Sequence, residues 1–400
     1  MSRGMTGLKL YLNDLGILSA AGNDGKDMLA RLLAGDRSGL IRTDKYSPGQ
    51  PFYVGAVQGE LPEIESKYGV YACRNNQLLL AALNQILPTV DGMIRCYGKA
   101  RVGVVIGTSS SGVRNTELAL AEIARGRPKP PQFHYKQQQF AGGADFLAHL
   151  LGVTGPAYAI STACSSSGRA FASARRLIAL GLCDAVIVGG ADSLCRFTVC
   201  GFDALESVSA GRCKPFGRHR DGINLAEAAS LFVLSKDEGP VTLQGIGSSS
   251  DAYHFSAPDP AGNAVIAAMQ MALTDAKIRP EQIDYVNLHG TATPLNDAME
   301  SKALHSVFGE AVAVSSSKGM TGHALGAAAA LELGICWLLL TQDDQTGLLV
   351  PNINDDVIDS SLPALNYVSP GQVLGRPMRH CQSNSFAFGG NNISIIVSRT

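Results

Sequence analysis

The chain has 400 residues, of which 46% are hydrophobic and 17% are charged. This composition excludes a largely disordered chain, and the length suits two or three domains or one large duplicated domain. The 33 basic and 34 acidic residues give a net charge of −1, which argues against a nucleic-acid-binding protein held by bulk charge.

The nine cysteines contain no C-x-x-C pair, and an odd number of thiols without zinc spacing favours a reducing compartment. The apolar start at residues 8–12 is too short for the hydrophobic region of a signal peptide. No stretch reaches the roughly 18 apolar residues of a membrane span. We therefore expect a cytoplasmic α/β protein without a membrane span.

Strands and helices are predicted to alternate in two rounds. Apolar runs and helical spacing predict, in chain order, a strand at 8–18, helices at 24–33 and 71–87, a strand at 102–106, a helix at 116–124, a strand at 158–161, a helix at 165–180, and strands at 184–190 and 231–234. A polar Gly/Ser stretch at 245–251 could separate the two rounds. The second round is predicted to contain a helix at 264–276, strands at 285–288 and 311–314, a helix at 325–340 and a strand at 393–397. The rhythm predicts a duplicated α/β protein with halves at 1–250 and 251–400.

A short basic segment follows the helix predicted at 116–124. Arg125, Arg127 and Lys129 stand among three prolines, which predicts a surface loop with a local positive patch. The alternative is a solvated loop without a partner.

The first chemical motif surrounds Cys164, in the sequence STACSSSG. A strand runs into a tight turn and a helix begins at or just after the cysteine. The positive end of the helix dipole favours a thiolate there, as an acyl-accepting nucleophile needs. The alternative is an ordinary cysteine packed in the core.

Two histidine motifs follow in the second half. His289 ends an apolar strand and precedes Thr291 and Thr293, whose hydroxyls could bind a polar ligand arm. His323 lies in a loop that also contains Lys318 and leads into an alanine-rich helix. A structural histidine in a turn and a surface lysine are the alternatives.

Glu332 lies inside that apolar helix, where an unpaired carboxylate would be costly to bury. Lys318 is the obvious candidate partner. Further along, the sequence NSFAFGGNN places Phe386 and Phe388 in a glycine-rich loop. Such a loop is typical of a movable flap over an apolar cavity, or of a C-terminal hairpin turn with aromatic packing.

These motifs together resemble the β-ketoacyl-acyl-carrier-protein synthases of the elongating, Cys-His-His type. The resemblance spans nearly the whole chain and depends most on STACSSS, HGTATPLND, SSSKGMTGHALGAAAALE and NSFAFGGNN, with GFDALESVS and RDGINLAEAA in mid-chain. It implies the thiolase fold, two duplicated halves in a layered αβαβα architecture. It also implies an acyltransferase that condenses an acyl thioester with malonyl-acyl-carrier protein and releases CO2.

The resemblance also assigns roles to the residues of the motifs. It makes Cys164 the nucleophile and makes His289 and His323 the histidines of the decarboxylation site. It implies that Lys318 and Glu332 support them, that Thr291 and Thr293 meet the phosphopantetheine arm, and that the backbone N–H groups of Cys164 and Phe388 form the oxyanion hole. Phe388 would gate the acyl pocket beside Phe386. No metal or other cofactor is implied.

The implied partners are an acidic acyl carrier protein and a second chain. The second chain would pair through the sheet edge near residues 158–161, as a homodimer or as a heterodimer with a related chain. A basic rim would steer the carrier, and Arg74, Arg125, Arg127 and Lys129 are its candidates. The alternative for each is a solvated surface cation.

Several positions depart from the family pattern. Ala387 and Asn392 replace a usual glycine and threonine, and residues 224–229 lack two usual glycines. An alanine methyl could stiffen the gate. These departures leave the reaction type in place and suggest a specialised polyene- or polyketide-type ketosynthase rather than housekeeping fatty-acid synthesis.

Two other functions are weighed against condensation. A thiolase would need a second catalytic cysteine inside the C-terminal loop, whereas Cys381 precedes that loop. A non-catalytic partner that sets chain length would lack the nucleophile, whereas Cys164 is present.

Overall fold

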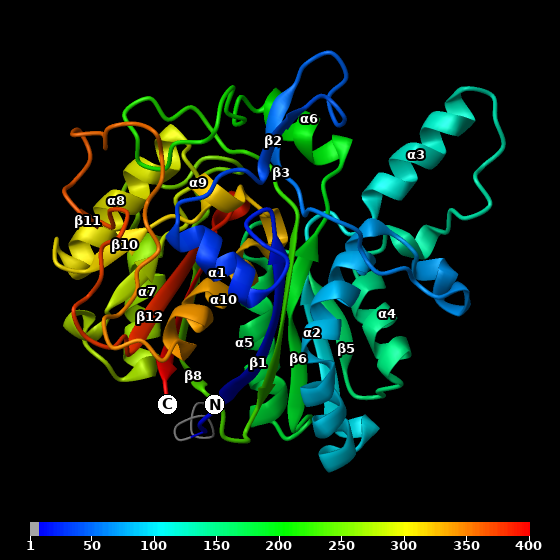
Figure 1. Ribbon diagram of the computed structural model, residues 1–400, viewed down its shortest axis with the longest axis horizontal. Coiled ribbons are helices and arrows are strands. Elements are labelled where there is room, and N and C mark those ends of the chain that lie inside the picture. The colour runs from blue at the N-terminus through cyan, green and yellow to red at the C-terminus, as the bar shows by residue number, and fades with distance from the viewer. Residues whose placement is uncertain (1–7) are drawn as a thin grey trace.

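A computed structural model describes residues 8–400. The strands are β1 (Tyr11–Ser19), β2 (Leu40–Thr43), β3 (Phe52–Gly55), β4 (Val102–Gly107), β5 (Ala157–Ile160), β6 (Ala185–Asp192), β7 (Ala228–Ser235), β8 (Val241–Ser250), β9 (Tyr285–Asn287), β10 (Ala313–Ser315), β11 (Asn366–Tyr367), β12 (His380–Phe386) and β13 (Asn391–Arg399). The helices are α1 (Gly25–Leu33), α2 (Arg74–Tyr97), α3 (Val113–Ala124), α4 (Gly142–Leu151), α5 (Ser166–Ala179), α6 (Arg196–Ala204), α7 (Asn263–Ala276), α8 (Pro294–Phe308), α9 (Lys318–Thr321) and α10 (Ala328–Thr341). Figure 1 shows their arrangement.

The same strand order occurs twice. The N-terminal half has the order β5-β4-β6-β7-β1, and the C-terminal half has β10-β9-β12-β13-β8, with β11 at its outer edge. In each half the first three strands run parallel to one another. The fourth strand is antiparallel to the third, and the fifth is antiparallel to the fourth. The halves join where the start of β1 pairs with the start of β8. The repeated order is the expected signature of a duplicated α/β protein.

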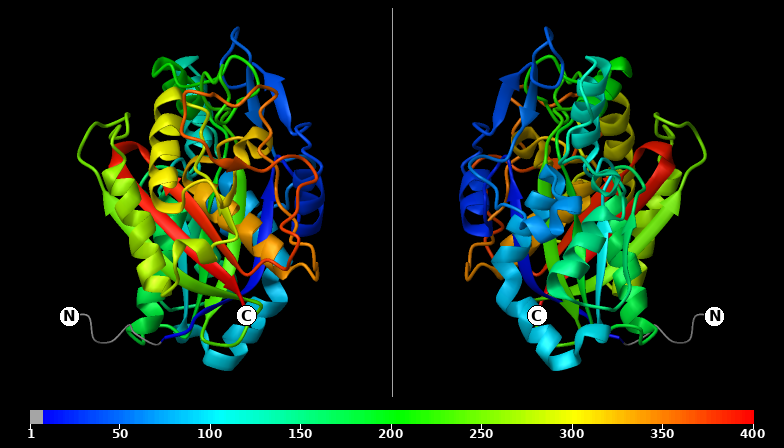
Figure 2. Two further views of the ribbon diagram at one scale, coloured as in Figure 1. Left: turned by 90° about the vertical axis from the view of Figure 1, so that its left-hand side faces the viewer. Right: turned by 90° about the vertical axis from the view of Figure 1, so that its right-hand side faces the viewer.

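Five layers are stacked in the order helices, sheet, helices, sheet, helices (Figures 1 and 2). Helices α5 and α10 form the middle layer, α2 and α4 cover the outer face of the N-terminal sheet, and α7 and α8 lie outside the C-terminal sheet. Glu332 is the only charged residue of α10, and the other sides of the helix are apolar, so it lies buried except at Trp337 and Thr341. The predicted thiolase-type αβαβα architecture is confirmed.

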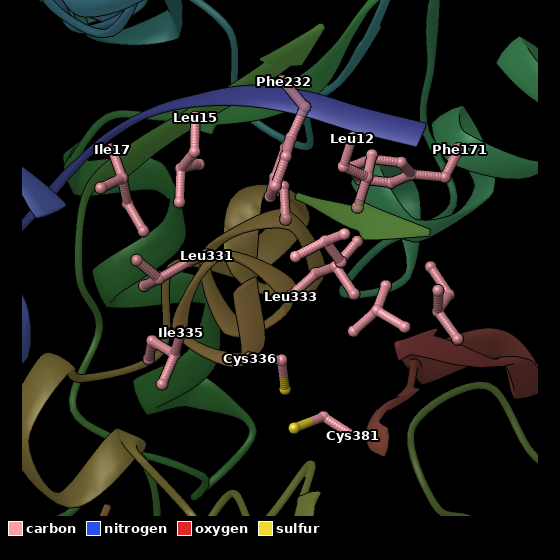
Figure 3. Packing of buried hydrophobic residues seen from close by; sticks show 14 of the residues in the cluster. Leu12, Leu15, Ile17, Phe171, Phe232, Leu331, Leu333, Ile335, Cys336 and Cys381 are labelled. Carbon is pink, nitrogen blue, oxygen red and sulfur yellow. The ribbon is translucent and has the colours of Figure 1, made fainter. Parts of the chain in front are cut away.

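The middle layer contains the largest hydrophobic cluster. Figure 3 shows Leu331 and Leu333 of α10 below residues of β1 and β7, with Phe171 of α5 at the right of the view. The rings of Phe171 and Phe232 meet edge to face, with centroids 5.2 Å apart. Both halves therefore share one core, which fixes α5 and α10 relative to each other.

The polar stretch at residues 245–251 differs from its expected role as a separator. Residues 245–250 belong to β8, which pairs along its length with β13. Glycines 245 and 247 suit this strand because a Cβ at either position would lie within 2.4 Å of the backbone of α7. The proposed division of the chain at residue 250 stays a prediction. Among residues 8–400, no helix is both long and apolar enough to cross a membrane.

Helix α5 approaches strand β4 closely at Gly107. An added Cβ there would lie 2.2 Å from the backbone nitrogen of Ser167. The atoms in contact belong to the backbone of β4 and of α5, so a larger residue could be fitted only by shifting a whole element. The glycine therefore sets the distance between the sheet and the helix that follows Cys164.

We predict that Gly107→Ala lowers the free energy of unfolding by about 1–3 kcal/mol, because the methyl group overpacks this contact. Urea unfolding measures the change. Gly92→Ala in α2 is the control, because a Cβ there has nothing within 4 Å and alanine favours a helix by up to about 1 kcal/mol. Equal midpoints for the two variants would contradict the prediction.

Candidate active site

Cys164 lies in the turn between β5 and α5. The residue before it, Ala163, has a φ of 51°, in the left-handed region that side chains other than glycine rarely adopt. Ser166 Oγ holds this turn by donating to the carbonyl of Ala163 at 2.6 Å and accepting the N–H of Thr162 at 2.8 Å. The strained turn directs the Cys164 sulfur away from α5 and toward the other half of the molecule, where it meets His323.

The thiolate expected from the helix N-terminus is wrong. Burial raises the pKa of the Cys164 thiol to about 12, although the Lys318 ammonium and the Phe388 backbone N–H act in the opposite direction. Cys164 also precedes Ser165, the N-cap of α5, so it lies outside the first helical turn. Desolvation therefore outweighs the helix dipole, and a neighbouring base must take the proton before the sulfur can attack.

Two histidines from the C-terminal half complete the cluster. His323 Nε2 lies 3.0 Å from Cys164 Sγ, and the His289 and His323 rings are 5.4 Å apart and nearly perpendicular. The donor atoms of all three side chains lie within 4.8 Å of one another. Burial, followed by the positive charge of Lys318, holds the pKa of both histidines well below the usual value. Both imidazoles are therefore neutral at pH 7.

Lys318 and Glu332 form a buried ion pair behind the histidines. The Lys318 ammonium donates to a Glu332 carboxylate oxygen and to the backbone carbonyl of His289. Both side chains are 1% exposed. Burial raises the pKa of Glu332 to about 7, while Lys318 acts to lower it. The pair joins α9 to α10 and fixes the backbone at His289.

A cavity of about 250 Å³ leads to the cluster. Its walls include Cys164, His289, His323, Phe386 and Phe388, together with Thr291 and Thr293, whose hydroxyls are 2.9 Å apart. The sequence-predicted residues of the four motifs therefore meet at one cavity, with Lys318 and Glu332 directly behind its wall. A polar arm that reached Cys164 through this cavity would pass both threonines.

The glycine-rich loop forms part of the wall. Phe388 stacks on Phe202 of α6, with ring centroids 5.5 Å apart, and Phe386 lies against His289 at 6.0 Å. Ala387 has an ordinary extended backbone, with a φ of −98°. The left-handed positions are Gly389 and Gly390. Alanine at 387 thus fits the backbone without strain, and the positions that require glycine lie after Phe388.

The four candidate docking cations lie in different environments. Arg74 forms a bidentate ion pair with the buried Glu227, through bonds of 2.8 and 2.5 Å. Arg125 and Arg127 are exposed but share the carboxylate of Glu122. Lys129 lies over the Phe133 ring, at 5.8 Å. None of the four lines the cavity, whose lining includes the carboxylates Glu206, Asp221 and Asp251.

Sequence reasoning missed several residues that hold the histidines. Glu300, fully buried on α8, accepts the backbone N–H groups of His289 and Gly290, each at 2.7 Å. The His323 N–H donates to the carbonyl of Asn224 at 2.7 Å. Glu300 shares α8 with Asp297 and Lys302, so nothing in the sequence singles it out or indicates its target.

Thiols and imidazoles are also zinc ligands, so Cys164, His289 and His323 have the donor types of a metal site. The expectation that no metal takes part stays a prediction.

Cys381 lies outside the cluster of Cys164, His289 and His323. It is fully buried, with its sulfur 3.0 Å from that of Met378. Figure 3 shows it beside Cys336 of α10. This position does not suit the second catalytic cysteine of a thiolase.

Comparisons with known proteins agree with this geometry. Residues 74–239 match the family model "Beta-ketoacyl synthase, N-terminal domain", and residues 241–355 match "Beta-ketoacyl synthase, C-terminal domain". A 3-oxoacyl-[acyl-carrier-protein] synthase 2 from Vibrio cholerae is 32% identical over 99% of this chain and 100% of its own length.

Solved structures show the same fold along the whole chain. A ketosynthase (ApeO) described in complex with its chain length factor (ApeC), from Xenorhabdus doucetiae, is 42% identical with a TM-score of 0.94, covering 100% of both chains. A β-ketoacyl synthase from Burkholderia phymatum is 27% identical with a TM-score of 0.86, covering 98% of this chain and 99% of its own. The chain therefore belongs to the β-ketoacyl synthase family.

Proposed function

We propose that this protein is an acyltransferase that condenses an acyl chain on Cys164 with a malonyl group on an acyl carrier protein. The products are a β-ketoacyl carrier protein and CO2. The observation that carries the proposal is the meeting of Cys164, His289 and His323 at one cavity. A buried thiol next to two neutral imidazoles suits acyl transfer followed by stabilisation of an enolate.

In the first step the acyl chain moves from the carrier to Cys164. His323 takes the thiol proton and passes it to the departing carrier thiol, so that the imidazole is neutral again afterwards. The backbone N–H of Phe388, which points at the sulfur, and that of Cys164 stabilise the oxyanion. Loss of one such donor typically costs about 3–4 kcal/mol of transition-state stabilisation.

In the second step the malonyl group loses CO2. The phosphopantetheine arm passes Thr291 and Thr293, and the malonyl thioester carbonyl accepts hydrogen bonds from His289 and His323. The C–C bond between the malonyl α-carbon and the carboxylate breaks, and its electron pair stays on the resulting enolate. The α-carbon of the enolate then attacks the acyl thioester carbonyl and displaces the Cys164 thiolate. Neutral imidazoles serve here as N–H donors. The loss of CO2 drives the step, so it needs no metal or redox cofactor.

The acyl chain belongs to a specialised polyene- or polyketide-type pathway in this proposal. Support comes from the higher identity to the ketosynthase described with a chain length factor, 42%, than to the fatty-acid-type relative, 32%. The departures at Ala387 and Asn392, both in the cavity wall, agree with an altered acyl site.

We also propose two partners. A second related chain pairs along the edge strand β5, whose residues are all half-exposed, giving a homodimer or a heterodimer. An acidic acyl carrier docks near the cavity mouth. Arg125, Arg127 and Lys129 remain its candidate contacts, whereas Arg74 is committed to Glu227.

Nine unpaired cysteines support a reducing location, which we take as the cytoplasm.

The test of the proposed function is covalent labelling. Mass spectrometry of the protein with acyl carriers should find the acyl group on Cys164, with faster labelling from unsaturated than from saturated chains. Cys164→Ala should lose the label, and Cys200→Ala, which changes a cysteine outside the cavity, should keep it. A label that persists in Cys164→Ala refutes the proposal. An unlabelled native protein also refutes it and is the result expected of a non-catalytic partner that sets chain length.

The acylation rate of Cys164 should stay near its maximum from pH 8 down to about pH 6. Burial and Lys318 lower the pKa of His323, so the neutral form persists below the usual histidine value of about 6.5. Single-turnover acylation measures the profile. In His323→Asn the residual rate should climb steadily with pH, because the pKa of the thiol is about 12. A native rate that falls by half at pH 6.5 or above contradicts the prediction.

Glu332→Gln should lower the free energy of unfolding by about 3–5 kcal/mol, because it leaves the Lys318 ammonium buried without its counter-ion. The double variant Lys318→Met/Glu332→Gln should recover most of that stability. It should still lose malonyl decarboxylation, because the His289 carbonyl then lacks its donor. Denaturant unfolding and CO2 release measure the two effects. A double variant less stable than Glu332→Gln would count against this assignment.

A further inference from the structure

Another buried carboxylate lies between the two halves of the active site. Asp192 is the last residue of β6 and is fully buried. Its oxygens accept hydrogen bonds from five groups: Thr108 Oγ1 (2.6 Å), Ser109 N (2.9 Å), Ser110 N (2.8 Å), Ser110 Oγ (2.9 Å) and Gly326 N (2.7 Å). It does not line the cavity, so it does not touch the substrates.

One side of this network leads to the nucleophile. Residues 108–110 form the turn after β4, and Asp192 binds every one of them. From that turn, Ser109 Oγ donates to the carbonyl of Ala163 at 3.2 Å. Ala163 is the residue with the left-handed backbone directly before Cys164. The carboxylate thereby braces the strained turn that directs the sulfur.

The other side leads to the histidine. Gly326 lies three residues after His323, in the short 3-10 helix Leu325–Ala327 that directly precedes α10. A Cβ at Gly326 would lie 2.7 Å from the Ser109 nitrogen and 2.8 Å from Asp192 Oδ2. Glycine therefore permits the close approach, and the Asp192–Gly326 bond ties the segment after His323 to the N-terminal half.

The chemistry of the network requires a carboxylate. Three of the five donors are backbone N–H groups, which cannot reverse their direction. An ionised carboxylate only accepts, whereas an amide in its place would turn an NH2 group toward these donors. Hydrogen bonds to a charged group are stronger than those between neutral groups, so together they can offset the cost of burying the charge.

We propose that Asp192 is a positioning residue that holds Cys164 and His323 in register across the two halves. It acts through Ser109 and Ala163 on one side and through Gly326 on the other. The inference rests on the proposed function only in that Cys164 and His323 must act together. Their 3.0 Å contact joins segments 159 residues apart in the chain, so the register has to be fixed by bonds that cross between the halves.

The experiment compares Asp192→Asn with Asp284→Asn. Asp284 is another buried carboxylate that lies outside the cavity; it accepts the backbone N–H groups of Arg379 and His380 and also pairs with Arg376. Each variant is assayed for thermal unfolding, for alkylation of Cys164 by iodoacetamide and for acylation by an acyl carrier. Alkylation needs no carrier, so it reports on the register even if the proposed condensation is wrong.

In Asp192→Asn we expect alkylation and kcat for acylation to fall by about 10- to 100-fold, the scale of a misplacement of about 1 Å. KM for the acyl carrier should stay unchanged, because the carrier never meets Asp192. Asp284→Asn should lose a similar amount of thermal stability and keep both rates. Asp192→Glu, which retains the carboxylate, should recover part of the lost rate.

Native rates in Asp192→Asn would show a purely structural residue and would overturn the inference. Faster alkylation would also overturn it, because the carboxylate would then act only by repelling the thiolate. If Asp192→Asn does not fold, Ser109→Ala replaces it, since this change removes only the bond to Ala163. A native alkylation rate in Ser109→Ala would likewise overturn the inference. The two proposals can fail separately. If the native protein is not acylated but alkylation is slowed in Asp192→Asn, the condensing function is refuted and the positioning role stands.

Discussion

The active site depends on one constraint, the close packing of the start of α5 against the start of α10 and the neighbouring strands. Small residues make it possible. A Cβ on Gly168 would lie 2.8 Å from Ile393 and 3.2 Å from Ala329, and one on Gly190 would lie 2.7 Å from Ser167. Cys164 precedes α5 and His323 precedes α10, so the approach of these two helix starts brings a thiol and an imidazole into contact. Larger side chains would separate the helices, and with them the reacting groups.

The same packing sets the protonation states. Cys164, His289 and His323 are all nearly fully buried, and this burial raises the pKa of the thiol and lowers that of both histidines. The single positive charge of Lys318 acts in the same direction on the histidines and is balanced by Glu332. A site of neutral groups follows, in which the proton moves between sulfur and imidazole when the acyl chain arrives.

Several features were accessible to sequence reasoning because they depend on local pattern. The apolar run at residues 185–188 and the continuous apolar surface of α10 predict buried elements wherever they occur. The need of Glu332 for a cation follows from its position in that helix. By contrast, β8 ends in three serines, and only its pairing with β13 makes these residues a strand. Arg74 looked like a surface cation because its partner, Glu227, is 153 positions away.

The fold class, the family resemblance and the residue types of the chemistry can be read from the sequence, since these depend on periodicity and on short motifs. How those residues act depends on the folded arrangement. It placed Asp192 between the two halves, bonded Glu300 to the backbone of His289, and made burial outweigh the helix dipole at Cys164. The physical reason is that desolvation and hydrogen-bond partnership depend on groups from distant segments, which approach one another only when the two sheets close around α5 and α10.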